Sequence, residues 1–332
     1  MLTHLDDAGV AALLGSYGLS LIDFAPTARG IENTNYFVTA RASAGQTRRL
    51  VLTIIEDGRA PSSFLPSLLE QLTRAGLPVP ALLRTGSGYA YASHPPLQNT
   101  VTAAAPRPVL LCQRLAGVHR HAATPADCAT IGRFLARLHR AASPLCGVAP
   151  EHPRQGTWLL ARCIALHTEL AAWQASLLDE AVAYALKLLQ RGDYAALPDA
   201  VVHGDLFRDN ALFTADGLSG VIDFHHAARH KRLFDVAVAV NDWCTTLEHR
   251  VDDVRAFALL SGYQAITPLT LSERLLLPGM LAYAALTFAL SRLHVAAADA
   301  NPSTITLPSK SALPMLLKLN HHLREPWLGR AA

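Results

Sequence analysis

Residues 201–213, VVHGDLFRDNALF, place five polar side chains between two apolar runs. These side chains are His203, Asp205, Arg208, Asp209 and Asn210. A polar group buried without a partner costs about 1–3 kcal/mol, so a packed domain does not collect this many of them without a use. The stretch is therefore either an exposed hairpin loop or a functional site.

A further carboxylate follows at Asp223, eighteen positions after Asp205. The segments 211–213 and 220–224 have the composition of short β-strands, and the Asp-Gly pair between them is a strong turn signal. Such a hairpin brings Asn210, before its first strand, close to Asp223, at the end of its second. Hard oxygen ligands of this type suit Mg²⁺, which takes its remaining ligands from water and phosphates.

Phosphoryl transfer requires these residue types in this arrangement. Asp205 can accept the proton of an attacking hydroxyl, while Asn210 and Asp223 hold a metal ion on nucleotide phosphates. Because the transition state is loose, an Asp near its ordinary pKa of about 3.9 acts more by orientation than by basicity. We therefore interpret the polar stretch as a catalytic loop.

The bulk properties narrow the class of protein. A chain of 332 residues exceeds the roughly 250–300 at which a single core tends to split, so we expect two lobes with a cleft between them. The 29 Lys and Arg exceed the 26 Asp and Glu by three, which is too little for the basic field of a nucleic-acid-binding protein. Five scattered cysteines without a CxxC pair, and no export signal in MLTHLDDAGV, predict a cytoplasmic protein.

The pattern of apolar residues divides the chain. Strands are predicted at 19–24, 35–40, 49–55, 89–93 and 109–115, with a helix at 64–75. Helical patterns then dominate, after Thr124-Pro125, at 156–191 and from 234 to the end. Thr124 is a favourable N-cap residue, and Pro125 is favourable at the first position of a helix. The uncharged run Leu275–Ser291 has 17 residues, short of the about 20 that span a membrane, so we expect a buried core helix.

The catalytic stretch also carries a resemblance. HGDLFRDN followed by VIDF resembles the catalytic and metal-binding motifs of the aminoglycoside phosphotransferase family, relatives of the protein kinases. GIENTNYFVTA, VLTIIE, FDVAVAVNDWC and ALTFALSRL are similar to the bacterial homoserine kinases within that family. The resemblance implies a protein-kinase-like bilobal α+β fold, with a small antiparallel-sheet N-lobe (1–115) and a larger, mainly helical C-lobe (116–332).

The same resemblance implies the chemistry and its residues. ATP and Mg²⁺ would phosphorylate the hydroxyl of L-homoserine, a step of threonine synthesis, with no nucleic acid or membrane partner. Asp205 would be the base, and Asn210 and Asp223 the Mg²⁺ ligands. The nucleotide would be bound by the side chains of Asn33, Thr34 and Asn35 at the phosphates and by the backbone of the hinge from Gln113 to Leu115 at the adenine.

Some positions allow more than one interpretation. Thr53 stands where a kinase usually has a Lys for the α- and β-phosphates, and we hypothesise that Arg208 supplies the missing charge. Asp235 either caps a helix or bonds the catalytic loop. The basic cluster 229–232 is expected to be a solvated loop. The segment 241–243 either packs between helices or binds the ammonium group of the acceptor.

Two other functions are compatible with these motifs. The first is another small-molecule kinase of the family, acting on choline, an aminoglycoside or a sugar. An aminoglycoside site would favour an acidic C-terminal segment, whereas residues 301–332 contain four Lys or Arg and one Glu. The second is a catalytically silent nucleotide-binding module, for which Thr53 is the only support.

Overall fold

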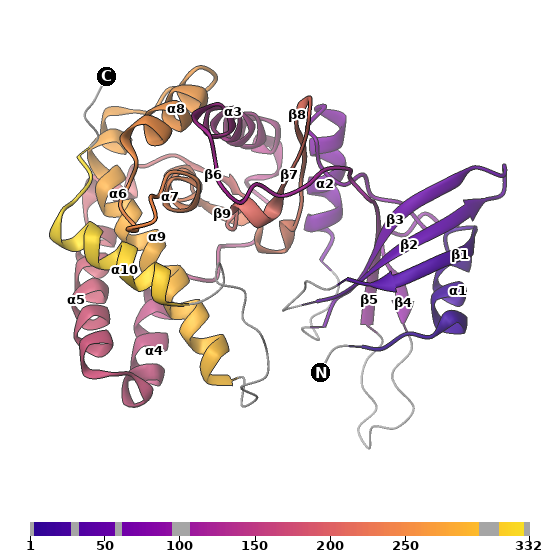
Figure 1. The fold of residues 1–332 in the computed structure, drawn as a ribbon, viewed down its shortest axis with the longest axis horizontal. Coiled ribbons are helices and arrows are strands. Elements are labelled where there is room, and N and C mark those ends of the chain that lie inside the picture. Colours follow the sequence, from indigo (N-terminus) through magenta and orange to yellow (C-terminus); the bar gives the residue numbers. More distant parts are fainter. Residues whose placement is uncertain (1–2, 28–32, 57–61, 95–106, 299–311, 329–332) are drawn as a thin grey trace. The chain divides into compact units, whose positions relative to one another are not determined.

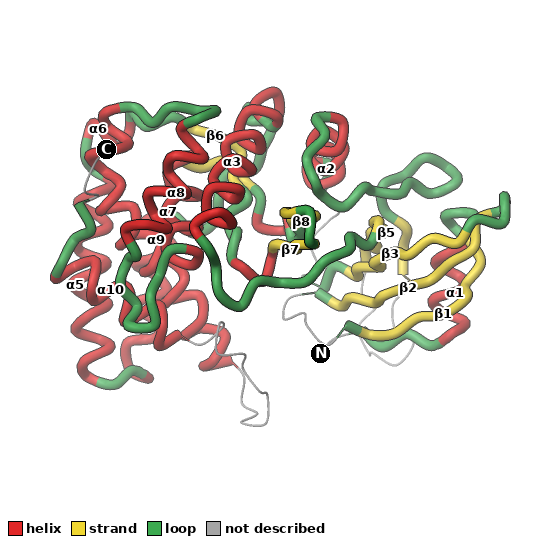
Figure 2. Tube along the Cα trace, turned by 45° about the horizontal axis from the view of Figure 1, so that its top comes forward, coloured by secondary structure: helices red, strands yellow, loops and turns green. Residues whose placement is uncertain are grey.

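The computed structural model describes residues 3–27, 33–56, 62–94, 107–298 and 312–328 (Figure 1). The chain forms two compact units. The first comprises Met1–Gly117 and Ser219–Ile222, and the second comprises Val118–Leu218 and Asp223–Ala332. Figure 2 shows that strands predominate in the first unit and helices in the second.

The first unit is built on an antiparallel sheet of five strands in the order β1-β2-β3-β5-β4. The strands are β1 (Leu19–Pro26), β2 (Thr34–Ala42), β3 (Thr47–Ile54), β4 (Ala92–His94) and β5 (Arg107–Gln113), and the helices are α1 (Asp7–Gly15) and α2 (Phe64–Arg74). Strand β2 alternates, with Tyr36, Val38 and Ala40 buried on one face. These side chains share a core with Val10 and Leu13 of α1, which therefore covers that face.

The second unit is mainly helical. Its helices are α3 (Pro125–Ala141), α4 (Gly156–Leu166), α5 (Ala172–Leu189), α6 (Gly192–Ala195), α7 (Arg232–Trp243), α8 (Asp253–Gln264), α9 (Leu271–Ala298) and α10 (Ala312–Arg324). Its strands are β6 (Asp199–Val202), β7 (Ala211–Thr214) and β9 (Ala228–Lys231). Strand β8 (Gly217–Val221) begins in the second unit, and its residues from Ser219 onward belong to the first. β6 pairs with β9, and β7 and β8 form the predicted hairpin.

Helix α9 is the core helix of the second unit and packs on α7, α5, α4 and α10. Pro278 lies inside α9 and does not end it. The stretch Leu271–Ala296 is long and apolar enough to cross a membrane, but 78% of its most apolar window is buried inside the protein. This burial agrees with the predicted core helix.

Two local predictions are wrong. Residues 229–232 are not a solvated loop: Ala228–Lys231 is strand β9, with His230 buried, and Arg232 opens α7. Both nitrogens Nε and Nη2 of Arg232 bind the buried Glu273 carboxylate at 2.7 Å. Asp223 does not end the second hairpin strand, because β8 stops at Val221 and Asp223 has a left-handed backbone with φ of 66°.

Candidate active site

The catalytic loop connects β6 to β7 and is held at its start by Asp235. The Asp235 carboxylate, fully buried in the first turn of α7, accepts the backbone N–H groups of His203 at 2.7 Å and Gly204 at 2.8 Å. His139 approaches the same carboxylate at 3.1 Å and is held in turn by Tyr263 at 2.9 Å. Of the two interpretations for Asp235, the structure therefore supports the bond to the catalytic loop.

Burial alone would raise the pKa of the Asp235 carboxyl. The hydrogen bond and charge of His139, together with the bond from Gly204, outweigh that effect and hold this pKa below its ordinary value. Asp235 therefore remains a carboxylate that can accept both backbone groups at neutral pH.

Asp205 and Asn210 meet inside this loop. Asn210 Nδ2 donates to the Asp205 carbonyl at 2.7 Å and to its carboxylate Oδ2 at 3.0 Å. His203, which is fully buried, accepts the Asp205 backbone N–H on Nδ1 at 3.2 Å, so it binds the loop backbone. The predicted base thus has a fixed orientation, since its backbone and side chain are both bonded within the loop.

The electrostatic environment of Asp205 favours its protonated form. Burial is the largest cause, and with the negative charges of Asp223 and Asp209 it raises the pKa of Asp205 to about 7. The charges of His226 and Arg154 oppose this shift. This pKa departs from the ordinary value expected from the sequence, because burial was not visible there. A carboxyl with a pKa near the operating pH suits a general base.

The predicted metal ligands Asn210 and Asp223 can present hard oxygens. The amide nitrogen of Asn210 donates to Asp205, so the amide oxygen is the group that Asn210 can offer to a cation. Asp223 is exposed, and its charge acts on Asp205. Across the described ranges, no three His, Cys, Asp or Glu side chains gather as a metal site. The oxygen groups of Asn210 and Asp223 are of the type that suits a cation which completes its shell with water and phosphate oxygens, as Mg²⁺ does.

The far part of the loop is anchored by Asp242, whose importance sequence reasoning missed. Asp242 accepts the backbone N–H of Arg208 at 2.7 Å and its Nε at 3.1 Å, while Arg208 Nη1 reaches the His121 carbonyl at 2.6 Å. Trp243 Nε1 donates to the Leu206 carbonyl at 3.0 Å. Helix α7 thus holds both parts of the loop, and a contact of Arg208 with phosphate stays a prediction.

Asn241, the first residue of the segment 241–243, serves helix packing. Its Nδ2 donates to the Leu281 carbonyl of α9 at 2.9 Å, and its Oδ1 bonds His322 of α10 at 2.8 Å. The Asn241 carbonyl also accepts Lys318 Nζ. These contacts favour the packing interpretation over a contact with the acceptor.

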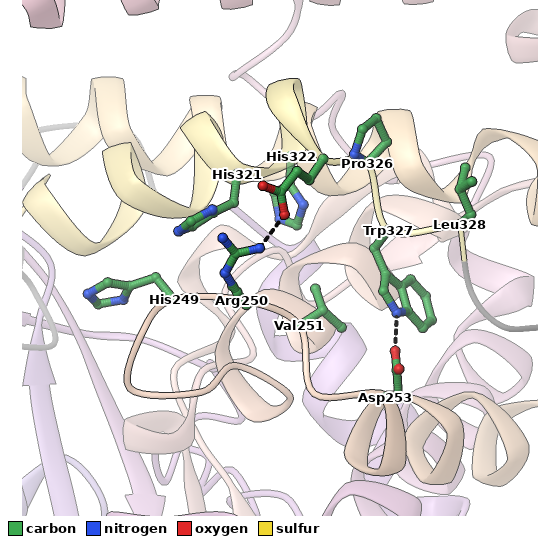
Figure 3. Close-up of a pocket in the computed structure, with 10 residues that line it drawn as sticks. His249, Arg250, Val251, Asp253, His321, His322, Pro326, Trp327 and Leu328 are labelled. Carbon is green, nitrogen blue, oxygen red and sulfur yellow. Dashed lines mark hydrogen bonds and ion pairs between the residues drawn. The ribbon is translucent and has the colours of Figure 1, made fainter.

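A pocket at the end of the chain lies beside α10 (Figure 3). It is lined in part by His249, Arg250 and Trp327 and by none of the predicted site residues. Trp327 Nε1 donates to Asp253 at 2.7 Å, and Arg250 pairs with Glu325. These contacts tie the C-terminal segment to the second unit.

In the first unit, the predicted phosphate-binding side chains are bonded to one another and to their neighbours. Asn35 Oδ1 accepts Thr53 Oγ1 at 2.6 Å, across the β2–β3 pair. Asn33 Oδ1 accepts the backbone N–H of Glu56 at 3.2 Å. Thr34 is buried against the Glu56 carboxylate. Residues 28–32, which precede them in the sequence, lie outside the described residues.

The predicted hinge follows β5. The Gln113 N–H donates to the Ala81 carbonyl at 2.8 Å, so carbonyl groups and the Leu115 N–H are the backbone groups the hinge can offer to adenine. Leu115 lies against Gly220, where an added Cβ would come within 2.5 Å of Leu115 Cδ1. Adenine binding by this segment stays a prediction.

The chain is similar to characterised kinases over most of its length. A sequence model described as the phosphotransferase enzyme family matches residues 23–269. Homoserine kinase from Pseudomonas aeruginosa is 37% identical over 309 residues, which cover 91% of this chain and 91% of that protein. Homoserine kinase from Methylobacillus flagellatus is 37% identical over 277 residues, covering 82% and 80%.

Solved structures share the fold. Spectinomycin phosphotransferase, determined with ADP and spectinomycin, has a TM-score of 0.65 at 9% identity, covering 96% of this chain and 99% of that one. Amicoumacin kinase hAmiN, determined in complex with AMP-PNP, Ca²⁺ and Ami, has a TM-score of 0.64 at 14% identity, covering 93% of this chain and 89% of that one. The predicted kinase-like α+β fold is confirmed, and the chain belongs to the phosphotransferase enzyme family.

Proposed function

We propose that this protein is a cytoplasmic homoserine kinase that transfers the γ-phosphoryl group of ATP to the hydroxyl of L-homoserine, with Mg²⁺. The observation that carries the reaction type is the Asp205–Asn210 pair, held on α7 by Asp235 and Asp242. The choice of acceptor is supported by 37% identity to homoserine kinases over as much as 91% of the chain. All five cysteines are free thiols, which agrees with a reducing compartment.

Residues of this chain account for the transfer of the proton and for the orientation of the base. Asp205 accepts the proton of the acceptor hydroxyl as its oxygen forms a bond to the γ-phosphorus. The bond from that phosphorus to the β,γ-bridging oxygen breaks, and ADP leaves with the electron pair. Asn210 keeps the Asp205 carboxylate from rotating by donating to Oδ2.

The remaining assignments follow the same proposal. Asn210 and Asp223 would hold Mg²⁺, which neutralises charge on the phosphates when bound. Asn33, Thr34 and Asn35 would contact phosphate, the segment from Gln113 to Leu115 would bind adenine, and Arg208 would add positive charge at the phosphates.

An acceptor panel tests the function. ADP release with Mg-ATP is measured on the purified chain with L-homoserine, choline, kanamycin and fructose, and the product is identified by phosphorus NMR. We expect L-homoserine to have the highest kcat/KM and Asp205→Asn to lose about 10²–10⁴-fold in kcat. Preference for another acceptor would support the first alternative function, and ATP binding without turnover would support a silent module.

A further inference from the structure

Two arginines meet at one aromatic ring in the second unit. Arg154, in the segment before α4, places its Cζ 5.5 Å from the Phe288 ring centre, and Arg292 of α9 places its own 5.9 Å from the same centre. The Tyr283 hydroxyl donates to the Arg154 carbonyl at 3.2 Å, which fixes the segment that carries Arg154. Nothing in the local sequence around either arginine marks this pairing.

The Phe288 ring also contacts the catalytic loop. Phe288 packs edge-on against Phe207, with ring centres 4.7 Å apart, and Arg292 also lies over Phe207 at 5.1 Å. Phe207 comes two residues after Asp205. The charge of Arg154 lowers the pKa of Asp205, and the charge of Asp205 raises the pKa of Arg292. Both guanidinium groups are therefore within electrostatic range of the proposed base.

This arrangement places the positive charges of Arg154 and Arg292 at the same ring. Burial lowers the pKa of Arg292, and the neighbouring charge of Arg154 acts in the same direction. The charges of Asp242, Asp205 and Asp209 act in the opposite direction on the pKa of Arg292. Among the residues that the structure describes, Arg154 forms no ion pair with a carboxylate. An anion bound at both guanidinium groups would relieve their repulsion.

We propose that Arg154 and Arg292 bind the α-carboxylate of the amino-acid acceptor, an inference that rests on the proposed function. A guanidinium group presents paired N–H donors that match the two oxygens of a carboxylate, and aromatic rings favour this cation over a lysine ammonium. Binding here would hold the acceptor beside Asp205 through the end remote from its hydroxyl. The subsite would select hydroxylated amino acids over amino alcohols that lack the carboxylate.

The test compares L-homoserine with L-homoserinamide, in which a neutral amide replaces the carboxylate. We expect the wild type to prefer the acid. Arg154→Met should lower kcat/KM for L-homoserine by roughly 10- to 100-fold, the range of a lost charged hydrogen bond. At a pH well above 7, where Asp205 is deprotonated in both proteins, it should leave kcat/KM for the amide and the KM for ATP nearly unchanged. Arg292→Lys, which keeps the charge of a buried site, should show a smaller loss confined to the acid.

Arg162→Met is the matched control. Arg162 is half-buried and lies 5.5 Å from the Trp158 ring centre, the same distance as Arg154 from the Phe288 ring centre. Unlike Arg154, it is not among the main causes of the pKa shift of Asp205. It should leave both acceptors unaffected.

The outcomes separate the two proposals. Equal losses of the acid and the amide, a wild type that does not discriminate between them, or a raised KM for ATP with an unchanged KM for L-homoserine would each overturn the carboxylate subsite. In those cases homoserine turnover by the wild type still supports the proposed function. Failure of the wild type to phosphorylate L-homoserine would overturn the function and, with it, the subsite.

Discussion

Arg208 is joined to Asp242 through both its backbone N–H and its guanidinium group, at 2.7 Å and 3.1 Å. Burial would raise the pKa of Asp242, but the charges of Arg208 and Lys318 and the bonds from Arg208 hold it below its ordinary value. A carboxylate of α7 thus fixes the half of the catalytic loop that contains Asn210. The pair connects helix packing to the placement of the proposed metal ligand.

If this pair positions the loop, then Arg208→Ala and Asp242→Asn should lower kcat by similar factors, with the double variant little worse than either. We expect a coupling energy of about 0.5–3 kcal/mol from a double-mutant cycle on kcat. The measurement is steady-state kinetics at saturating L-homoserine. A raised KM for ATP in Arg208→Ala, absent from Asp242→Asn, would instead place the guanidinium group on the phosphates.

The raised pKa of Asp205 predicts the acid limb of the pH profile. The base is active when deprotonated, so kcat/KM for Mg-ATP, which reports the free enzyme, should fall as the pH drops through about 7. The Asp209 charge raises this pKa, so Asp209→Asn should move the limb to lower pH. Asp216→Asn, at the exposed hairpin turn, is the control and should not move it. A limb that stays in place in Asp209→Asn would contradict the electrostatic account.

Removing the proposed carboxylate ligand should change the metal requirement. Asp223→Asn should raise the Mg²⁺ concentration for half-maximal activity and lower kcat, because a neutral amide is a poorer ligand for a hard cation. The readout is ADP release titrated with Mg²⁺ at fixed ATP. An unchanged Mg²⁺ titration would remove Asp223 from the metal site.

Buried histidines predict acid sensitivity of the fold. Burial lowers the pKa of His230 and His322 to about 4 and of His152 to about 2, whereas an unfolded His titrates near 6.5. Protons therefore bind the unfolded chain first. Stability is complete above pH 6.5 and falls as the pH drops from there towards 4, by up to about 3 kcal/mol for each of His230 and His322.

Urea unfolding at several pH values measures this loss. His322→Gln should have a flatter dependence between pH 6.5 and 4 than the wild type, whereas His4→Gln, at an exposed site, should follow the wild type. Parallel curves for all three proteins would show that His322 does not carry the acid sensitivity.

Helices α3 and α8 approach at two glycines. A Cβ on Gly262 would lie 2.2 Å from the Ala129 carbonyl oxygen, and one on Gly132 would lie 2.0 Å from that of Leu259. Gly262→Ala should therefore lower the free energy of unfolding by about 1–3 kcal/mol or more. Gly192→Ala meets no atom within 4 Å and is the control in the same denaturation experiment. Equal stability of the two variants would mean that the helices separate without cost.

Much of the candidate site could be predicted from the sequence. The loop from His203 to Asn210 and the hairpin after it follow from polar spacing and an Asp-Gly turn, which are local properties. The helices α2 and α3 and the first three strands follow from apolar periodicity and capping, which act over a few residues. Local patterns thus located the proposed base and one of its partners.

Contacts between distant segments settled the rest. Strand β9 was missed because Ala-Arg-His-Lys lacks an apolar alternation, and it is a strand because it pairs with β6. The left-handed backbone of Asp223, the anchoring by Asp242 and the placement of Arg154 and Arg292 at the Phe288 ring also have no local signal. Burial and hydrogen bonding across the fold decide which polar side chains face one another, because their energies depend on partners that lie far away along the chain.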